Sequence, residues 1–371
     1  MTLDPLDLSI GIEKLYYNWN KISAKIPRPE GFTVIEEVNY TPVTEWKGDE
    51  IGNFAFYLLE KVNRDHFSVI NELSRIFHKK VRYLGIKDTN AITFQLIYTD
   101  APSNVKEYNG NNFHVTFLGY YNSKISHTGN IFNIRLISDD EEEIKTRLNI
   151  ISQNPYLPAY IGYQRFGTKR PITHIVGRYL LKEEWCKAIM YILSMPFYSE
   201  SDIMRDIRKM IYNNNYEEAL RYIPSSFAQE KTLLKNLIRS GNCYEALKSS
   251  KIPLYFYVEA YQSYLFNRYL SRKIDELRDI PDKDNFTLTF PLEISKCDDD
   301  CIRILDEEGI FEEEFKNNEL KFNLKPITRK AFMKIRKLKY ENGSITFAID
   351  RGMYATVFLK ELLNANPLEI T

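Results

Sequence analysis

The chain of 371 residues has few cysteines and few histidines. The five histidines are scattered, and so are the cysteines except for the last pair (Cys186, Cys243, Cys297 and Cys301). Three aspartates separate Cys297 from Cys301, which is the wrong spacing for a zinc knuckle, and no partner pair follows. We therefore expect free thiols in a reducing cytoplasm and no metal site.

Long apolar runs are also missing. No stretch of about twenty apolar residues exists, so the sequence predicts no membrane span. The N-terminus, residues 1–4, lacks a basic-then-apolar leader, and nothing there points to secretion. With 44% apolar and 27% charged residues, the composition is that of an ordinary soluble globular protein, and the length favours two or three domains. We expect a cytoplasmic protein.

Net charge is absent as well, since 50 basic residues balance 50 acidic ones. This counts against simple nucleic-acid binding, because Lys and Arg contacts to phosphate supply most of the non-specific affinity. The charges are segregated, however: residues 329–339 carry six cations and no acid, whereas acids cluster at 139–143, 298–300 and 306–314. This pattern fits a basic face with an acidic back, and it fits plain solvated surfaces equally well.

Periodicity predicts strands in the first part of the chain and helices in the middle. Asp65 is a suitable N-cap for a helix that follows it. The expected strands cover residues 32–38, 53–61, 92–98, 113–118, 131–137 and 345–349. The expected helices cover residues 10–19, 139–151, 178–193, 200–213, 217–222, 230–239 and 253–274.

One polar loop stands between two apolar segments at residues 83–95. It contains Lys87, Asp88, Thr89 and Asn90. Taken alone, an aspartate between two strands is usually a turn residue that hydrogen-bonds its own backbone.

The whole stretch resembles the signature of the TruD family of pseudouridine synthases, Gly-x-Lys-Asp-x-x-Ala-x-Thr-x-Gln. Six positions agree in register: Gly85, Lys87, Asp88, Ala91, Thr93 and Gln95. So many fixed positions in so short a stretch make the match specific. The resemblance implies that Asp88 is the catalytic carboxylate.

Further segments resemble this family in the same order, from residue 29 to residue 362. They match Pro-Glu-Asp-Phe-x-Val-x-Glu at 29–36, Gly-Asn-x-Phe-x-Ile at 129–134, and Pro-Asn-Tyr/Phe-Phe/Tyr-Gly-x-Gln-Arg-Phe-Gly at 158–167. Residues 260–271 match a helix of archaeal and eukaryotic relatives, and residues 351–362 resemble the family's closing Gly-Ser-Tyr-Ala-Thr segment.

Four positions depart from the family pattern. Ile26 stands where a Lys or Arg commonly pairs with the catalytic carboxylate, with Lys25 and Arg28 as neighbouring substitutes. Gly31 replaces an aspartate, Ala159 an asparagine and Ile161 an aromatic ring. In the family the last two side chains belong to the uridine pocket, so we expect weakened or differently furnished base capture.

The resemblance implies an α+β protein with the pseudouridine synthase fold: a mixed, mostly antiparallel sheet flanked by helices, plus an inserted, mainly helical TRUD-type domain. We expect residues 1–167 and 326–371 to form the catalytic domain and residues 168–325 to form the insertion, of which 275–325 is acid-rich.

The implied activity is the isomerisation of a specific uridine to pseudouridine in tRNA, at the thirteenth nucleotide or another site. No redox change occurs and no external group is consumed, so we expect no cofactor. The expected substrate-binding residues are Glu36, Lys87, Asn130, Phe132, Tyr160, Ile161, Gln164, Arg165 and Phe166. The expected contacts to the RNA backbone are Lys79, Lys80, Arg82, Lys169, Arg170, Arg329 and Lys330.

Two alternatives stay open. One is an RNA-binding protein of this family that has lost catalysis, and the other is a hydrolase that uses Asp88 and Glu36 as paired carboxylates. The sequence indicates neither the target nucleotide nor the oligomeric state.

Overall fold

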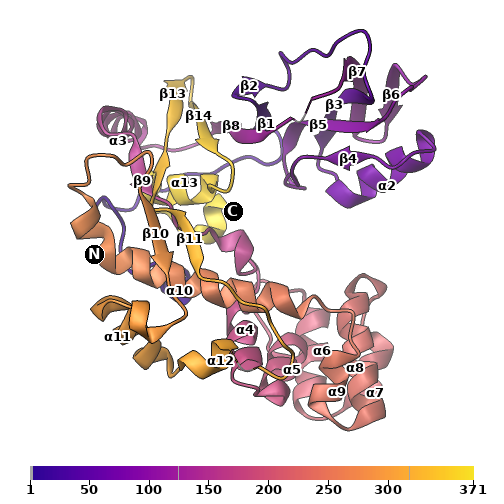
Figure 1. Cartoon of the computed structure of the whole chain (residues 1–371), viewed down its shortest axis with the longest axis vertical. Helices are drawn as coiled ribbons and strands as arrows, with labels where there is room; N and C mark the ends of the chain where they lie inside the picture. Colours follow the sequence, from indigo (N-terminus) through magenta and orange to yellow (C-terminus); the bar gives the residue numbers. More distant parts are fainter. Residues whose placement is uncertain (1–2, 124, 317) are drawn as a thin grey trace.

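The computed structural model describes residues 3–123, 125–316 and 318–371, so Met1 and Thr2 of the expected leaderless N-terminus lie outside the described residues. Within them the chain forms one ten-stranded sheet and two small two-stranded sheets. Figure 1 shows two lobes on the right that are joined by the sheet and helices on the left. Strands β3, β5, β6 and β7 with helix α2 form the upper lobe, and helices α4 to α9 form the lower one.

The main sheet has the order β13-β14-β8-β1-β5-β3-β7-β6, with β2 and β4 paired to β1 and β5. Among the described strands, β1 and β5 are parallel and the other paired strands are antiparallel, so the predicted mixed, mostly antiparallel sheet is confirmed. The strands are β1 Phe32–Val38, β2 Thr41–Pro42, β3 Phe54–Val62, β4 Arg82–Tyr83, β5 Ile92–Asp100, β6 Glu107–Gly110, β7 Phe113–Tyr121, β8 His127–Arg135, β13 Arg336–Glu341 and β14 Ser344–Asp350.

The upper lobe is built on the two faces of β3. Tyr57 and Leu59 pack on one face against Leu73 of α2 (His66–Ile76), whereas Phe56 packs on the other face with Leu96. This alternation follows from the period of two along a strand. Asp65 caps α2 as predicted, since its carboxylate accepts a hydrogen bond from the Ser68 amide at 2.8 Å.

The lower lobe is helical, and the long helix α10 (Leu254–Leu277) joins it to the sheet. The small sheets pair β9 (Tyr156–Pro158) with β12 (Phe332–Lys334) and β10 (Thr287–Phe290) with β11 (Ile327–Lys330). The remaining α-helices are α1 Pro5–Ser9, α3 Glu141–Gln153, α4 Thr173–Leu181, α5 Trp185–Ser194, α6 Asp202–Tyr212, α7 Tyr216–Tyr222, α8 Ala228–Ser240, α9 Cys243–Lys248, α11 Asp299–Glu308, α12 Glu312–Lys316, α13 Ala355–Leu363 and α14 Pro367–Ile370. Short 3-10 helices lie at Tyr163–Arg165, Ser225–Phe227 and Ile294–Lys296.

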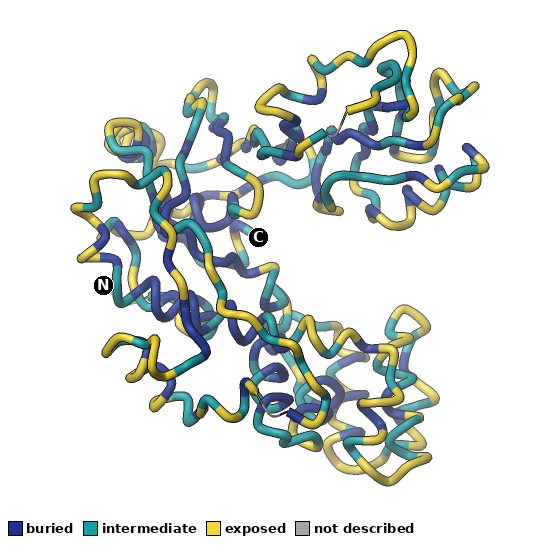
Figure 2. Tube along the Cα trace, viewed as in Figure 1, coloured by how far each residue is buried: buried dark blue, intermediate teal, exposed yellow. Residues whose placement is uncertain are grey.

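One apolar core runs from the sheet into the helices. It includes Phe132 and Phe347 of the sheet, Val176 of α4, Leu234 of α8 and Phe266 of α10. Figure 2 shows buried residues along α10 and around the C-terminal helices. The boundaries at 167 and 325 stay a prediction, because the chain passes them without a break in this core. In the described part of the chain, no helix has the length and apolar character needed to cross a bilayer.

The acid-rich segment 275–325 uses carboxylates to bind α10. Arg268 of α10 lies 2.8 Å from Glu308, and Arg272 lies 2.6 Å from Glu307. The clustered acids are therefore partners of cations on a neighbouring helix, as well as favourable residues for the first turn of α11.

Two helix predictions are wrong. Residues 10–19 form no helix, because α1 ends at Ser9 and the backbone amides of Tyr16 and Tyr17 bind the buried Glu361 carboxylate instead of helical carbonyls. The expected single helix over 178–193 is two helices, because the chain turns at Glu183, where φ is +57°.

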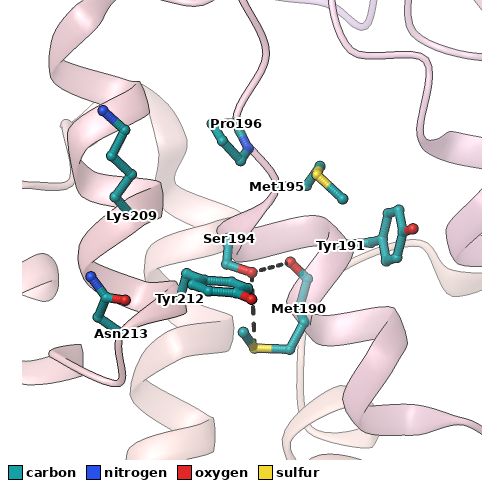
Figure 3. A pocket seen from close by; sticks show the side chains of 8 residues that line it. All are labelled: Met190, Tyr191, Ser194, Met195, Pro196, Lys209, Tyr212 and Asn213. Carbon is teal, nitrogen blue, oxygen red and sulfur yellow. Dashed lines mark hydrogen bonds between the residues drawn. The ribbon is translucent and has the colours of Figure 1, made fainter.

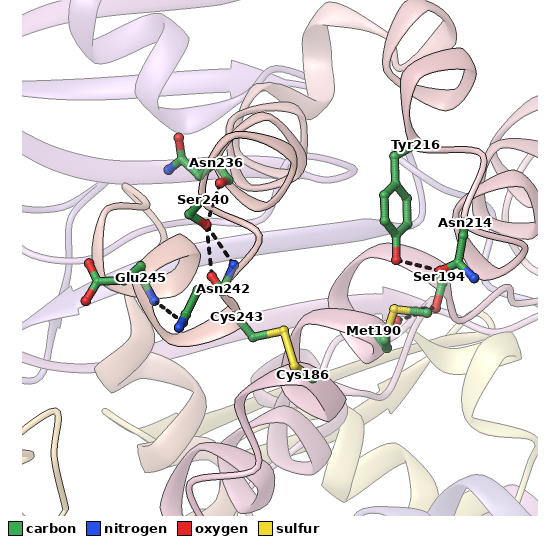
Figure 4. The surroundings of a disulfide bond; sticks show 10 residues. All are labelled: Cys186, Met190, Ser194, Asn214, Tyr216, Asn236, Ser240, Asn242, Cys243 and Glu245. Atoms are coloured by element: carbon green, nitrogen blue, oxygen red, sulfur yellow. Dashed lines mark hydrogen bonds between the residues drawn. A yellow bond between two sulfur atoms is a disulfide. The ribbon is translucent and has the colours of Figure 1, made fainter.

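The prediction of free thiols is also wrong. Cys186 at the start of α5 and Cys243 at the start of α9 form a disulfide, with Cα atoms 5.2 Å apart (Figure 4). Cys297 and Cys301 form a second disulfide, and no cysteine is free in the described chain. Cys186 and Cys243 are far apart in sequence, and only the packing of α5 against α9 brings them within bonding distance.

Glu361 makes the stability of this fold depend on pH. Burial raises its pKa to about 7, against 4.5 for the ordinary side chain, although the amides of Tyr16 and Tyr17 oppose the shift. As pH rises from about 4.5 to about 7, the unfolded chain ionises at this position before the native protein does. The free energy of unfolding should therefore fall by up to about 3 kcal/mol across this range and change no further above it.

Glu361→Gln keeps an acceptor for the two amides and removes the titration. Urea unfolding of both proteins from about pH 5 to pH 8 should show that the free energy of unfolding falls less in the variant than in the wild type. Equal falls in the two proteins would contradict this role of Glu361.

Candidate active site

Asp88 lies in the loop between β4 and β5 and borders a pocket of about 210 Å³. The side chain is exposed, so the aspartate faces open space rather than the core. The pocket is lined by Phe32, Val34, Ile86, Lys87, Asp88, Asn130, Phe132, Gln164, Met353, Tyr354, Ala355 and Thr356. These residues come from five segments distant in sequence, and three of the segments meet because β1 lies between β5 and β8 in the sheet.

The neighbouring Lys87 points the opposite way from Asp88, into the protein. Its Nζ lies 2.6 Å from Oε1 of Glu36, and both side chains are almost completely buried. The other oxygen of Glu36 accepts a hydrogen bond from the Leu96 amide at 2.9 Å. A lysine held inward in this way forces the next side chain outward, because neighbours on an extended segment face opposite sides.

Gly85 makes room for this ion pair. A Cβ at this position would lie 3.1 Å from Cε1 of His127 and 3.2 Å from Nζ of Lys87, which is tighter than normal packing allows. The Gly-x-Lys-Asp pattern thus has a structural meaning in this chain: the glycine admits the lysine, and the lysine orients the aspartate.

Two cations surround the Asp88 loop. Lys61 of β3 is fully buried, and its ammonium group donates a hydrogen bond to the backbone carbonyl of Asp88. Burial lowers the pKa of Lys61 to about 8, and the carboxylate of Asp88 opposes this shift. Arg28 donates to the carbonyl of Asn90 at 3.0 Å; burial lowers its pKa too, and Asp88 again opposes the effect. The Asp88 carboxylate therefore lies in a field of positive charge.

The walls of the pocket are aromatic. Phe32 and Phe132 lie edge to face, with ring centroids 6.1 Å apart, and Tyr354 closes another side. Two amides add polar edges: Asn130 lies on β8, and Oε1 of Gln164 accepts a hydrogen bond from the Thr356 hydroxyl at 3.2 Å. The pocket thus combines apolar and aromatic surface with directional polar groups, a combination that suits a flat heterocycle.

The expected substrate residues fall into separate places. Lys87, Asn130, Phe132 and Gln164 line the Asp88 pocket. Ile161 and Arg165 line a second pocket of about 530 Å³, which shares Tyr354 with the first.

The other three expected substrate residues line neither pocket. Glu36 lies beneath the loop as the partner of Lys87. Tyr160 and Phe166 are buried, and the hydroxyl of Tyr160 donates to the carbonyl of Lys14 at 2.6 Å. The structure places these two rings in the core rather than at the site.

The four departures from the family pattern have local explanations. Ile26 is buried in the main core, and Arg28 supplies the cation near Asp88. Gly31 stands in a tight turn in which a Cβ would lie 2.6 Å from the carbonyl oxygen of Pro27. Ala159 is buried, and Asn267 of α10 binds the backbone N–H and C=O of Ile161 at 2.8 and 3.0 Å.

The cations expected at the RNA backbone also differ in their surroundings. Arg82 pairs with Asp100 at 2.8 Å, Lys330 with Asp350 at 3.4 Å, and Arg170 donates to helix carbonyls inside the lower lobe. Arg329 lines the second pocket. The remaining three expected contacts are solvent-accessible to different degrees: Lys79, Lys80 and Lys169.

The rest of the basic stretch 329–339 is mostly neutralised. Arg336 and Lys337 bind the buried Glu37 at 2.6 and 2.8 Å, and Lys334 binds Asp284 at 2.9 Å. The basic surface is therefore much smaller than the six clustered cations of residues 329–339 would indicate.

A third cavity, of about 490 Å³, lies between α5 and α6 in the lower lobe (Figure 3). Its walls are mainly apolar, with Met190, Tyr191, Met195 and Tyr212 among them, and Lys209 is its charged residue. It offers no carboxylate for catalysis. No group of three or more His, Cys, Asp or Glu side chains in the described ranges is placed to hold a metal ion.

Several lining residues were not among the expected site residues. Phe32 and Tyr354 are the clearest, and both stand inside segments already quoted as signatures, at 29–36 and 351–362. Arg28 and Lys61 act from outside the pocket walls, and the sequence carries no sign that β3 passes beneath the Asp88 loop.

The buried pair of Lys87 and Glu36 gives a prediction about stability. Lys87→Met leaves the Glu36 carboxylate buried without its partner, which should lower the free energy of unfolding by about 3–5 kcal/mol. Chemical denaturation followed by circular dichroism measures this change. Adding Glu36→Gln should recover part of the loss, because the uncompensated charge is removed.

Lys80→Met is the matched control, since this lysine is exposed in the same region and should change stability by about 0.5 kcal/mol or less. If Lys87→Met cost no more than this control, the ion pair would not hold the loop.

The chain is similar in sequence to proteins of one known family. The family model described as tRNA pseudouridine synthase D (TruD) matches residues 9–285. The "Probable tRNA pseudouridine synthase D" of Saccharolobus solfataricus is 48% identical, and the alignment covers 100% of both chains. The protein of the same name from Sulfurisphaera tokodaii is 47% identical over 96% of this chain and 99% of its own length.

A crystal structure from Methanosarcina mazei, titled as a TruD protein, has the same fold. The two chains superpose with a TM-score of 0.77 over 100% of each, at 20% sequence identity. The family model matches most of the chain, and a relative that is 48% identical aligns over its full length; the chain therefore belongs to the tRNA pseudouridine synthase D (TruD) family.

Proposed function

We propose that this protein converts a uridine in tRNA to pseudouridine and that Asp88 is the catalytic carboxylate. The observation that carries the proposal is the exposed carboxylate of Asp88 at the border of a pocket of about 210 Å³ that Phe32, Phe132 and Tyr354 help to line. The names of the full-length relatives support the same activity.

The reaction breaks the N1–C1′ bond, turns the uracil and joins C5 to C1′. The proton that leaves C5 balances the one gained at N1, so no external reagent is consumed. A carboxylate serves this reaction either by attacking C1′ or by removing a proton from the sugar. In both cases it acts as the ionised carboxylate, and the cationic side chains of Lys61 and Arg28 bind backbone carbonyls of its loop.

To place its ring in this pocket, the target uridine must leave its stack before it reaches Asp88. Phe32, Phe132 and Tyr354 offer faces and edges for the ring, and the amides of Asn130 and Gln164 suit the carbonyl and N3–H groups of uracil. Ile161 does not line this pocket, so its departure from an aromatic residue leaves these three rings in place.

The target within tRNA is the finer part of the proposal. The thirteenth nucleotide is the first candidate, and another tRNA site is the second. Incubating the protein with unmodified tRNA and mapping pseudouridine by carbodiimide primer extension decides between these two candidate sites. No contact among the described residues favours an RNA-binding protein without catalysis or a hydrolase; Glu36, the second carboxylate of the hydrolase hypothesis, is buried against Lys87.

Asp88→Asn tests the catalytic role. The variant keeps the size of the side chain and loses the negative charge, so turnover should fall by at least about 10²–10⁴-fold. Affinity for tRNA, measured by filter binding, should stay close to that of the wild type. Asp139→Asn is the control, because this exposed aspartate lies outside the pocket. Normal turnover in Asp88→Asn would refute the assignment.

Lys61 gives the activity a dependence on alkaline pH. Its lowered pKa of about 8 means that the ammonium loses its proton as pH rises through 8, and its positive charge beside Asp88 is then lost. The value of kcat/KM should therefore decline above about pH 8. Lys61→Arg stays charged and should move this decline to higher pH, whereas Lys61→Met should be slow and lack the inflection at this pH. Ionisation of uridine itself is common to all three proteins, so identical pH profiles would contradict the role of Lys61.

A further inference from the structure

The second pocket, which we call the Arg329 pocket, lies beside the Asp88 pocket. It is bordered by Arg165, by Tyr255 and Glu259 of α10, and by Lys325 and Arg329 at β11. Tyr354 lines both pockets, so the two are neighbours across a single side chain. An RNA strand that places one base against Asp88 therefore has the Arg329 pocket within reach of the adjoining nucleotide.

The charges of the Arg329 pocket do not balance. Three of its lining residues are cations, and its acid, Glu259, is already paired with Arg165 at 3.0 Å. The side chain of Lys325 is exposed, and it forms no ion pair within the described ranges. The pocket thus carries an excess of positive charge that is left for a ligand.

The surroundings of Arg329 are the strongest indication that the pocket binds an anion. Its Nη2 donates to the carbonyl of Gly352 at 2.7 Å, but its buried Nε has no partner, and no carboxylate in the described chain lies within ion-pair distance of it. Burial lowers its pKa, and the charge of Arg165 lowers it further. A nearby anion would relieve both unfavourable effects.

Arg329 is partly buried, and two arginines of this chain that are buried are neutralised internally. Arg208 lies 2.7 Å from Glu200, and Arg268 lies 2.8 Å from Glu308. The contrast indicates that the partner of Arg329 comes from outside the chain. Tyr255 adds a half-exposed ring at the same pocket, on which a base can stack.

We propose that the Arg329 pocket binds the nucleotide that adjoins the target uridine, with its phosphate at Arg329 and Lys325 and its base beside Tyr255. This rests on the proposed function, because it assumes an RNA substrate at Asp88. It assigns to these residues the choice of which uridine enters the pocket, since the register of the strand is fixed by the phosphate next to it.

The test uses an RNA that the wild-type protein modifies, prepared as a series in which one phosphate near the target uridine is replaced by a neutral methylphosphonate. Affinity is measured with wild type, Arg329→Gln and Lys325→Gln. At one position adjoining the uridine, neutralisation should weaken wild-type binding about tenfold and should have little further effect on Arg329→Gln. The slope of log affinity against log salt should also fall by about one for each variant.

Lys235→Gln on α8 is the control and should bind like the wild type, because this exposed lysine lies far from both pockets in sequence and lines neither. Lys325→Gln alters an exposed side chain and should fold normally, so it tests phosphate binding at this pocket even if Arg329→Gln misfolds. Additive losses at every phosphate, or no loss in either variant, would overturn the inference while pseudouridine is still formed. Absence of pseudouridine with the wild type would instead refute the proposed function.

Discussion

The candidate active site depends on the buried ion pair between Glu36 and Lys87. Glu36 comes from β1 and Lys87 from the loop before β5, and the parallel pairing of these strands brings them together. Such a pair costs desolvation and adds little net stability, but it fixes geometry. Here it fixes which way the loop faces, and the outward direction of Asp88 follows. Gly85 and the hydrogen bond from Lys61 complete the support of the same loop.

Helix α10 has a comparable role for the larger frame. The fully buried Asn267 binds backbone groups of Ile10 and Ile161, so one side chain ties the helix to the N-terminal segment and to the segment after β9. Arg268, one residue further on, binds Glu13 and the acids of α11. The same helix also contributes Tyr255 and Glu259 to the pocket that holds Arg329.

The sequence predicted the longer strands β1, β3, β5, β7, β8 and β14 and the cap at Asp65, because short-range pattern decides each of them, but it missed β2, β6 and β13. Asp88 was singled out by the resemblance to a family signature, since the local pattern alone indicates a turn. The sequence did not show that Lys87, although it borders the pocket, turns inward and binds Glu36. Tyr160 and Phe166 were expected at the site and lie in the core, since an irregular segment has no fixed period from which to read direction. The disulfide of Cys186 and Cys243 depends on the packing of two helices far apart in sequence, which no local pattern records. The neutralisation of Arg336 and Lys337 by Glu37 is likewise a long-range fact.

The unbroken apolar core has a consequence for how substrate and protein adapt to each other. Two domains linked by a thin polar interface can close around a ligand by a hinge motion, whereas parts of a protein that share one packed interior resist such a motion. Here β1, β8 and β14 share one interior with the lower lobe, whereas the upper lobe packs in two clusters of its own. The side of the Asp88 pocket formed by β1, β8 and residues 353–356 is therefore held fixed relative to the lower lobe, and the nucleic acid must unstack and bend to match that side.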